Sequence, residues 1–366
     1  MTRLRLLADD LTGALDAGAE FVPTFGPIPC VWAPEAAGAE AAVFDSGTRD
    51  LGASAAAARF SRFAPVLDGA QIAFLKLDSL LRGHGVAELA ACLRGGPWRS
   101  AILAPAFPFQ GRVTRGGRQF ARDGQGQWTP VGPDLVDALQ AQGIPARLGL
   151  AGPQDGVSVC DAETQDDLQR IVAAGRHWAS PPLWCGSGGL ARALGAGPQS
   201  DTAAPLRGPI LGVFGSEQPA TAAQLAACPR WHLSLNVEAA GHAAAVSERM
   251  AQSGCALVSF TLPADTGRGA AATLISRAVS HLATTLPAPA TLLCAGGETL
   301  RALCAAVGTH RLDITGAMMP GVPRSRMRGG AWDGTEVISK SGAFGAPDLL
   351  HTLLNDACFA VERIGS

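Results

Sequence analysis

The sequence predicts an α/β protein of two domains, each a mainly parallel sheet flanked by helices, with an active-site cleft between the domains. Two observations lead to this class. The chain has 366 residues, which is too long for one ordinary hydrophobic core. Short apolar runs alternate with helical stretches along its length, as they do where helices connect parallel strands. A segment rich in Gly, Pro and Ala at residues 195–209 interrupts this alternation and is the predicted linker.

The composition narrows the class of protein. Hydrophobic residues make up 47 % of the chain and charged residues 16 %, with a formal net charge of −2, which is typical of a compact globule. Because the sequence has no run of basic residues, we expect no positively charged surface that would bind nucleic acid or a membrane. No apolar run reaches the roughly 20 residues of a membrane span, and the first strand follows Met-Thr-Arg directly, so we expect a cytoplasmic protein. Nine cysteines lie in apolar segments without a C-x-x-C pair, and we expect most of them as buried thiols.

The first half of the chain is expected to form seven strands, each followed by a turn or a helix. Right-handed crossovers place the turns after these strands along one edge of the sheet. Because ligands of open α/β sheets bind at that edge, the polar residues in these turns are candidates for a site. The expected strands lie near residues 4–8, 29–33, 41–45, 72–77, 100–104, 156–160 and 182–185.

Two adjacent acids end the first strand. Asp9 and Asp10 follow the apolar run, and Thr12 is a natural N-cap for the helix that comes next. Carboxylates at this edge are candidates to hold substrate hydroxyls, to accept a proton or to approach a metal ion. The alternative is an acidic turn that satisfies free amide groups at the start of a helix.

A cluster of opposite charges follows the fourth strand. Lys76, Asp78 and Arg82 suit an anionic, hydroxylated ligand, because the cations hold a carboxylate or phosphate and the acid accepts hydroxyl protons. Arg49, after the third strand, is a candidate second clamp for a carboxylate. The alternative is an internal network of salt bridges. The Gly/Arg loop at 110–118 is a further candidate for contact with an anion, or a solvated surface turn.

The second half of the chain contains a different recurring pattern: a strand, then a short turn of small residues, then a helix. Strands are expected near 210–214, 256–260, 291–294 and 336–339. The turns 215–216, 295–299 and 341–345 each precede a helix, and such helix N-termini bind phosphate through free amide groups. Thr299 offers a hydroxyl to a phosphate or to a hydrated metal, and Gly308 is a candidate C-cap. The alternative is a set of ordinary strand-to-helix turns.

Several common motifs are absent. The chain contains no G-x-x-x-x-G-K-[ST], so it is not a P-loop enzyme, and the glycines at 186–189 do not complete G-x-G-x-x-G. H-E-x-x-H and G-x-S-x-G are missing too, which argues against a zinc hydrolase and a serine esterase.

Taken in order, the motifs resemble those of the four-carbon acid sugar kinases, which phosphorylate threonate, erythronate and 3-oxo-tetronates. The resemblance covers nearly the whole chain and is specific as a set. The matching motifs are ADDLTGALDAG (8–18), FDSGTR (44–49), KLDSLLRG (76–83), PAFPFQGRVTRGG (105–117), CDAETQDDL (160–168), GSGGLARAL (186–194), FGSEQPATAAQ (214–224), AGGETLRAL (295–303), PGVP (320–323) and SKSGAFGAPDLL (339–350).

The resemblance implies a sugar-acid-binding domain at 1–200, a nucleotide-binding domain at 206–366, and transfer of the γ-phosphoryl group of ATP, with Mg²⁺, to the terminal hydroxyl of a four-carbon acid. The expected partners are a small sugar acid and a second copy of the chain in a homodimer, with neither nucleic acid nor a membrane. No metal ligands are assigned. The implied residues are Asp10 and Asp78 for catalysis, either of them as the base, Asp9, Arg49, Lys76 and Arg82 for the substrate, and Ser216, Gly296, Gly297, Glu298, Thr299 and Gly342 for ATP.

Two departures from the family pattern leave the identity of the acid open. The lysine motif usually reads K-T-D-S-T-L-R-G, and here Leu77 and Leu80 replace the threonines. The segment 118–135 also differs from the usual continuation. Two alternatives follow: a non-catalytic sensor of sugar acids and nucleotides, and a kinase of a different hydroxy acid on the same scaffold.

Overall fold

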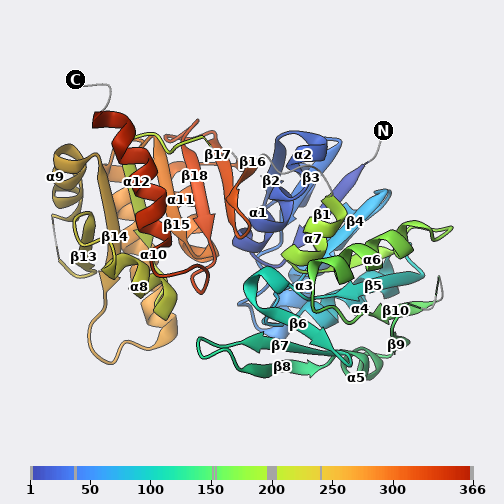
Figure 1. Ribbon diagram of the computed structural model, residues 1–366. Coiled ribbons are helices and arrows are strands. Elements are labelled where there is room, and N and C mark those ends of the chain that lie inside the picture. The colour runs from blue at the N-terminus through green and yellow to red at the C-terminus, as the bar shows by residue number, and fades with distance from the viewer. Residues whose placement is uncertain are drawn as a thin grey trace. The chain divides into compact units, whose positions relative to one another are not determined.

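The computed structural model describes residues 3–36, 39–150, 152, 155–195, 204–239 and 241–362, without the side chains of Ala36, Arg268 and 356–362. The chain divides into two compact units, residues 1–199 and 200–366 (Figure 1). Each unit is a mainly parallel sheet flanked by helices, so the predicted two-domain α/β class is confirmed. Most of the predicted linker, 196–203, lies outside the described residues. Within the described ranges, no helix has the length and apolar character needed to cross a bilayer.

The sheet of the first unit is parallel throughout its described strands. Its order is β2-β3-β1-β4-β11-β5-β10-β9. All seven predicted strands are confirmed, whereas the three-residue edge strand β9 was not predicted. The bounds are β1 (Leu4–Ala8), β2 (Ile28–Val31), β3 (Ala41–Asp45), β4 (Ile72–Lys76), β5 (Ser100–Ala104), β9 (Ala146–Leu148), β10 (Gly156–Val159) and β11 (Leu183–Gly186).

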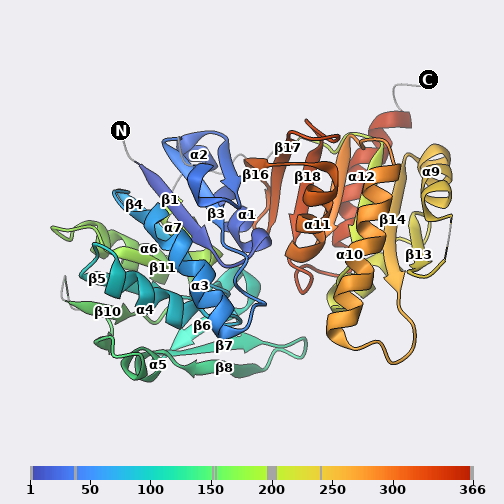
Figure 2. The ribbon, with the colours of Figure 1, turned by 180° about the vertical axis from the view of Figure 1, so that it is seen from behind.

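Helices cover both faces of this sheet. One face carries α1 (Leu11–Ala19), α6 (Gln165–Arg176) and α7 (Gly188–Gly195), and the other carries α3 (Ala53–Phe63) and α4 (Gly85–Gly95) (Figures 1 and 2). Strand side chains such as Leu7, Phe44, Leu75 and Leu103 are buried beneath α3 and α4 in one apolar core. Both faces of the sheet are thus buried, as expected for a continuous apolar strand pattern. The shorter elements are α2 (Val22–Phe25), α5 (Leu135–Ala141), η1 (Pro34–Ala36), η2 (Ala64–Leu67) and η3 (Pro108–Gln110).

A small antiparallel sheet was not predicted. It consists of β6 (Arg112–Arg115), β7 (Arg118–Arg122) and β8 (Trp128–Asp134), in the order β6-β7-β8. Strands β7 and β8 occupy the segment 118–135, where the sequence departs from the family pattern, whereas β6 lies in the matching motif at 105–117. The prediction missed it because arginines, glycines and prolines hide the alternation of its strands. Arg115 lies over the ring of Trp128, 5.1 Å from its centre, and this cation–π contact supports the hairpin.

The second unit has a mixed sheet in the order β13-β14-β12-β15-β18-β17-β16. Its first five strands are parallel, and β17 and β16 form an antiparallel edge. The four predicted strands are confirmed. The other three alternate polar and apolar residues, and were not predicted because the apolar runs used as the signal are absent there. The bounds are β12 (Ile210–Phe214), β13 (His232–Asn236), β14 (Cys255–Thr261), β15 (Thr291–Ala295), β16 (Arg311–Met319), β17 (Val322–Arg328) and β18 (Glu336–Lys340).

Helices α8 (Pro219–Ala226) and α12 (Leu349–Glu362) cover one face of the second sheet, and α10 (Arg268–Thr285) and α11 (Gly297–Val307) cover the other (Figures 1 and 2). Helix α9 (His242–Ser253) packs beside β14. Buried side chains such as Phe214, Leu257 and Leu293 form the core of this unit. The eight cysteines with described side chains are buried thiols, as predicted.

The cap of α1 differs from the prediction. Asp10, not Thr12, is the N-cap, because its carboxylate accepts the backbone N–H of Gly13 at 3.0 Å. The Thr12 hydroxyl instead donates to the other Asp10 oxygen at 2.6 Å. A carboxylate three residues before that amide reaches it directly, which leaves the threonine to orient the acid. The alternative of an acid that satisfies amide groups at the helix start therefore describes Asp10.

Candidate functional site

The turns after three neighbouring strands meet at the carboxyl edge of the first sheet. Strand β1 lies between β3 and β4, with Ala8 paired to Asp45 on one side and to Lys76 on the other. The residues that follow these strands are therefore brought together, as the order of parallel strands predicts. All six residues predicted for this half of the site lie here: Asp9, Asp10, Arg49, Lys76, Asp78 and Arg82.

Arg49 is the centre of this cluster. Its Nε and Nη2 donate to the two oxygens of Asp9 at 2.9 and 2.6 Å, and Nη2 also lies 2.7 Å from Asp10 Oδ1. Its Nη1 is 3.6 Å from Asp78 Oδ2. Burial lowers the pKa of Arg49, but the carboxylates of Asp10 and Asp9 outweigh that effect and hold the pKa above its ordinary value. Arg49 thus binds the aspartates together within the protein.

Asp78 is held by a second arginine. Arg82 Nε and Nη2 donate to its two oxygens at 3.0 and 2.7 Å, and the backbone N–H of Leu80 donates at 2.9 Å. Burial raises the pKa of Asp78, but the hydrogen bonds from Arg82 and the charge of Arg49 outweigh it and hold the pKa well below its usual range. A carboxylate of such low basicity is a weak proton acceptor.

Lys76 is the third cation of the cluster. It is the last residue of β4, is buried, and donates from Nζ to the carbonyl of Leu77 at 2.8 Å. A Cβ at position 13 would lie 3.1 Å from Lys76 Nζ and would collide with Asp10 Oδ1. Gly13 therefore lets the first turn of α1 approach the ammonium group closely.

The three aspartates differ in access to solvent. The side chain of Asp10 is 14 % exposed, against 1 % for Asp9 and 8 % for Asp78. Asp9 gives both oxygens to Arg49, and Asp78 gives both to Arg82. Asp10 is therefore the carboxylate best placed to meet a ligand hydroxyl.

A buried acid that sequence reasoning missed lies behind the cluster. Glu88 Oε1 is 2.5 Å from Thr48 Oγ1, which is 2.9 Å from Ser46 Oγ, and Ser46 in turn donates to the carbonyl of Ala8 at 2.9 Å. Burial, and then the charge of Asp9, raise the pKa of Glu88 to about 7. Thr48 Oγ1 is the donor to Glu88, and with a pKa of about 7 the Glu88 carboxyl group takes up a proton close to neutral pH. Its position inside a helical stretch gave no signal of this role.

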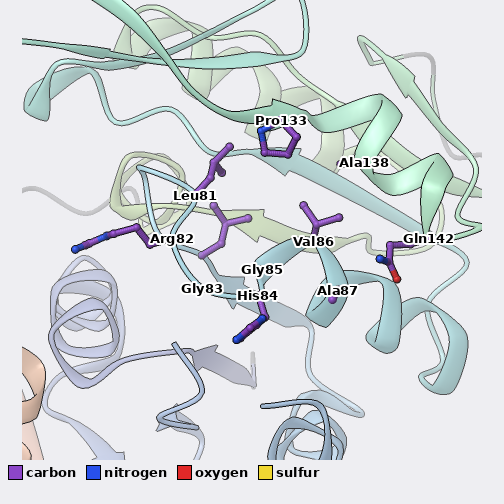
Figure 3. Close-up of a pocket in the computed structure, with 11 residues that line it drawn as sticks. Leu81, Arg82, Gly83, His84, Gly85, Val86, Ala87, Pro133, Ala138 and Gln142 are labelled. Carbon is purple, nitrogen blue, oxygen red and sulfur yellow. The ribbon is translucent and has the colours of Figure 1, made fainter. Parts of the chain in front are cut away.

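A cavity of about 300 Å³ lies beside this cluster (Figure 3). Its walls are mainly apolar, from Leu81, Val86, Pro133 and Ala138, while the side chains of Arg82 and His84 point away from it (Figure 3). Arg82 is directed to Asp78, and His84 Nε2 lies 2.7 Å from the carbonyl of Leu51. Such a lining does not suit a polyhydroxy acid, and we do not assign the cavity to one.

The second candidate site lies at the carboxyl edge of the second sheet. Strands β12, β15 and β18 are neighbours, with Phe214 paired to Ala295 and Ala295 paired to Lys340. The turns that follow them adjoin, and the N–H of Gly296 donates to the carbonyl of Lys340 at 3.1 Å. All six residues predicted for ATP lie in these turns or in the first turn of α11: Ser216, Gly296, Gly297, Glu298, Thr299 and Gly342.

Close packing holds the three turns together. A Cβ at Gly342 would collide with Ser216 Oγ, and one at Gly215 would lie 2.5 Å from Thr299 Oγ1. Gly296 is the N-cap of α11 with φ +100°, and it offers no side chain to the first amide groups of that helix. The predicted C-cap Gly308 is confirmed with φ +74°. Uncapped amide groups at such a terminus suit an anion.

A further cavity of about 310 Å³ opens beside Ser216. Apolar side chains of Phe214, Leu225 and Phe260 line it, and His232 Nε2 lies 2.8 Å from Ser259 Oγ at its side. Sequence reasoning did not find this cavity, because its lining comes from apolar residues of separate elements.

Comparisons with known proteins also assign one domain to the first half of the chain and another to the second half. Residues 4–148 and 134–194 match the model of a sugar-binding N-terminal domain, and residues 211–350 match that of a nucleotide-binding C-terminal domain. A D-threonate kinase of Cupriavidus necator is 33 % identical, over 93 % of this chain and 94 % of the relative. A 3-oxo-tetronate kinase of Pseudomonas fluorescens is 28 % identical, over 96 % of both chains.

Solved structures share the fold. A Salmonella typhimurium LT2 protein that was proposed to be a tRNA synthase superposes with a TM-score of 0.72 at 21 % identity, over 96 % of this chain and 98 % of that one. Haemophilus influenzae protein HI1011 superposes with a TM-score of 0.67 at 20 % identity, over 96 % and 99 %. At these identities the likeness concerns the fold alone.

Proposed function

Because the chain belongs to the four-carbon acid sugar kinase family, we propose that it transfers the γ-phosphoryl group of ATP to the terminal hydroxyl of threonate, erythronate or a 3-oxo-tetronate. The protein is accordingly a phosphotransferase with an alcohol acceptor. The observation that carries the substrate assignment is the cluster of aspartates, arginines and a lysine at one sheet edge. The cleft between the domains and the homodimer stay predictions, and the homodimer can be tested by sedimentation.

The first unit is proposed to bind the sugar acid. Arg82 has a half-exposed side chain, whereas that of Arg49 is 10 % exposed and Lys76 is buried. We therefore assign the substrate carboxylate mainly to Arg82. Arg49 and Lys76 fix the aspartates and balance their charge. A partly exposed arginine such as Arg82 can bind the carboxylate of a ligand through two parallel hydrogen bonds from its guanidinium group.

Asp10 is proposed as the base that orients the terminal hydroxyl and accepts its proton. Its greater exposure favours it over Asp9, and the low pKa of Asp78 argues against that residue. The bond from Thr12 and the cap to Gly13 fix the Asp10 carboxylate. In phosphoryl transfer the protein acts mainly by positioning groups and balancing charge, which suits so rigid an acid.

The second unit is proposed to bind ATP. The purine ring is assigned to the apolar cavity beside Ser216, and the phosphates to the amide groups of the 296–299 and 341–345 turns. Within the described residues no group of three His, Cys, Asp or Glu side chains forms a metal site. Mg²⁺ is proposed to enter with the phosphates, whose charge it balances, and the hydroxyl of Thr299 is the nearest candidate contact.

A coupled assay of ADP release with Mg-ATP tests this function. The panel contains D- and L-threonate, the erythronates, their 2- or 3-oxo forms and longer aldonates. We expect ADP release that depends on a four-carbon acid. Binding of ATP without turnover on any acid would favour the sensor, and turnover on longer acids alone would favour a kinase of a different hydroxy acid.

Asp10→Asn tests the assignment of the base. We expect turnover to fall on the order of 10²-fold, with the KM for the acid changed less. Asp50→Asn is the matched control, because this exposed acid lies in the neighbouring turn outside the cluster. Unchanged turnover in Asp10→Asn would remove that residue from the role.

A further inference from the structure

Lys340 is a buried cation whose described partners are all neutral. It is the last residue of β18 and is 4 % exposed. Its Nζ donates to Thr221 Oγ1 at 3.2 Å and to the carbonyls of Ser341 and Phe344 at 3.2 and 3.1 Å. Among the residues that the structure describes, no carboxylate forms an ion pair with it. An ammonium buried in this way is costly unless a negative charge balances it.

The contacts of Lys340 hold the candidate phosphate turn in shape. Thr221 Oγ1 donates to the carbonyl of Gly342 at 2.7 Å, and Gln224 Nε2 donates to that of Phe344 at 3.0 Å. Both α8 side chains are fully buried. The main-chain carbonyl of Lys340 also accepts the N–H of Gly296. One residue thus connects α8, the 341–345 turn and the N-terminus of α11.

The ionisable groups around Lys340 do not balance its charge. Helix α8 and the 341–345 turn carry none. In β15 the thiol of Cys294 is the group whose charge would act on Lys340, but burial raises the pKa of that thiol well above its ordinary value, so it is neutral. Glu217 precedes α8 and Glu298 lies in the first turn of α11, and neither carboxylate affects the pKa of Lys340. Burial lowers the pKa of Lys340 to about 8.

We infer that Lys340 is a positioning residue of the nucleotide site, and that the phosphates of the bound nucleotide supply its missing counter-charge. This inference rests on the proposed function. Proton binding by Lys340 and phosphate binding at the turn then favour each other, by linkage. Affinity for ATP is expected to be highest below about pH 8, where the amine is charged, and to fall as it loses its proton.

The composition of the chain allows a direct test. Lys76 and Lys340 are its two lysines, so protein labelled with ¹³C in lysine alone gives two side-chain NMR signals that can be followed against pH. We expect saturating Mg-ATP to raise the titration midpoint of Lys340 by about one pH unit or more, equivalent to tenfold tighter binding to the charged form. The Lys76 signal is the internal reference, which ATP is expected to leave in place. ATP that binds without moving the Lys340 midpoint would overturn the inference.

Measurements of Kd distinguish a role of the Lys340 charge from a purely structural role of this residue. Above about pH 7.5, where the phosphates are fully ionised, we expect the Kd for ATP to rise on the order of tenfold by about pH 9.5, and the Kd for adenosine to stay constant. Lys340→Met should weaken ATP to a similar degree at pH 7.5 and remove its pH dependence, and Lys340→Arg should restore affinity. Equal losses for ATP and adenosine in Lys340→Met would assign the lysine a structural role only. If that variant does not fold, the wild-type titrations decide alone. Failure of the wild-type protein to bind ATP at any pH would instead refute the proposed function.

Discussion

The two lysines of this chain occupy corresponding places in its two units. Lys76 ends β4 and Lys340 ends β18, and both are buried at the carboxyl edge of a parallel sheet. Lys76 lies in a cluster whose three aspartates balance Arg49, Arg82 and Lys76 itself, whereas Lys340 donates only to neutral oxygens. The first arrangement suits a ligand with one carboxylate and several hydroxyls. The second suits a polyanion that brings its own negative charge. We propose that this difference in charge balance distinguishes the site of the sugar acid from the site of ATP.

The largest expected effect comes from breaking the balanced cluster. Arg49→Met leaves the buried carboxylate of Asp9, and that of the neighbouring Asp10, without their cation, and we expect the free energy of unfolding to fall by about 3–5 kcal/mol. Urea denaturation at pH 7 measures this. Arg99→Met is the matched control, because its side chain and that of its ion-pair partner Asp155 are both exposed, and the pair should contribute no more than about 1 kcal/mol. Similar losses in the two variants would show that the cluster is not the centre of charge balance in the first unit.

Glu88 provides the next prediction, because its stability contribution depends on pH. Its pKa is raised to about 7 from its ordinary value of 4.5, so its contribution is fully present below pH 4.5 and is lost as pH rises through 7. Glu88→Gln keeps a neutral side chain at every pH. Relative to wild type, we expect the variant to gain on the order of 3 kcal/mol in unfolding free energy between pH 4.5 and pH 8. Chemical denaturation at several pH values measures the gain, and a constant difference would refute the protonated state.

The sequence was sufficient for the parts of the site that follow from strand order. Once the turns after β1, β3 and β4 are assigned, parallel pairing brings Asp9, Arg49 and Asp78 together, and the same reasoning unites the glycine turns of the second unit. The substrate and ATP roles of these residues stay predictions.

Other features depend on contacts that no local pattern encodes. Thr12 was expected to cap α1, yet Asp10 reaches the free amide group and Thr12 orients it. Glu88 was not singled out, and Lys340 was expected only as the residue that follows the strand at 336–339, because the roles of both arise from burial against distant segments. The hairpins of β6, β7 and β8 were missed because polar side chains interrupt their alternation.

A smaller effect is expected in the second unit. In Gly342→Ala the new methyl group collides with Ser216 Oγ and pushes the two turns apart, so we expect the KM for ATP to rise about tenfold, near 1.4 kcal/mol. The KM for the acid should hardly change. Gly269→Ala is the matched control, since it adds a methyl group to open space on α10. Steady-state kinetics with each substrate varied in turn measure both values, and an unchanged KM for ATP in Gly342→Ala would exclude the 341–345 turn from the nucleotide site.

The smallest effect tests whether the apolar cavity beside the first cluster belongs to the substrate site. Ala138 lines that cavity from α5, on the side away from Arg82 and His84 (Figure 3). Ala138→Leu places added methyl groups in the empty volume, and we expect the unfolding free energy to rise by about 0.5–1 kcal/mol without a change in kcat or in the KM for the acid. Ala138→Ser is the control, because serine is close to alanine in size and leaves the cavity almost unfilled. Because the chemistry is assigned to the balanced cluster, filling the cavity should leave it intact. A KM for the acid that rises tenfold in Ala138→Leu and not in Ala138→Ser would mean that the substrate extends into this apolar space, and would favour a larger hydroxy acid over a four-carbon one.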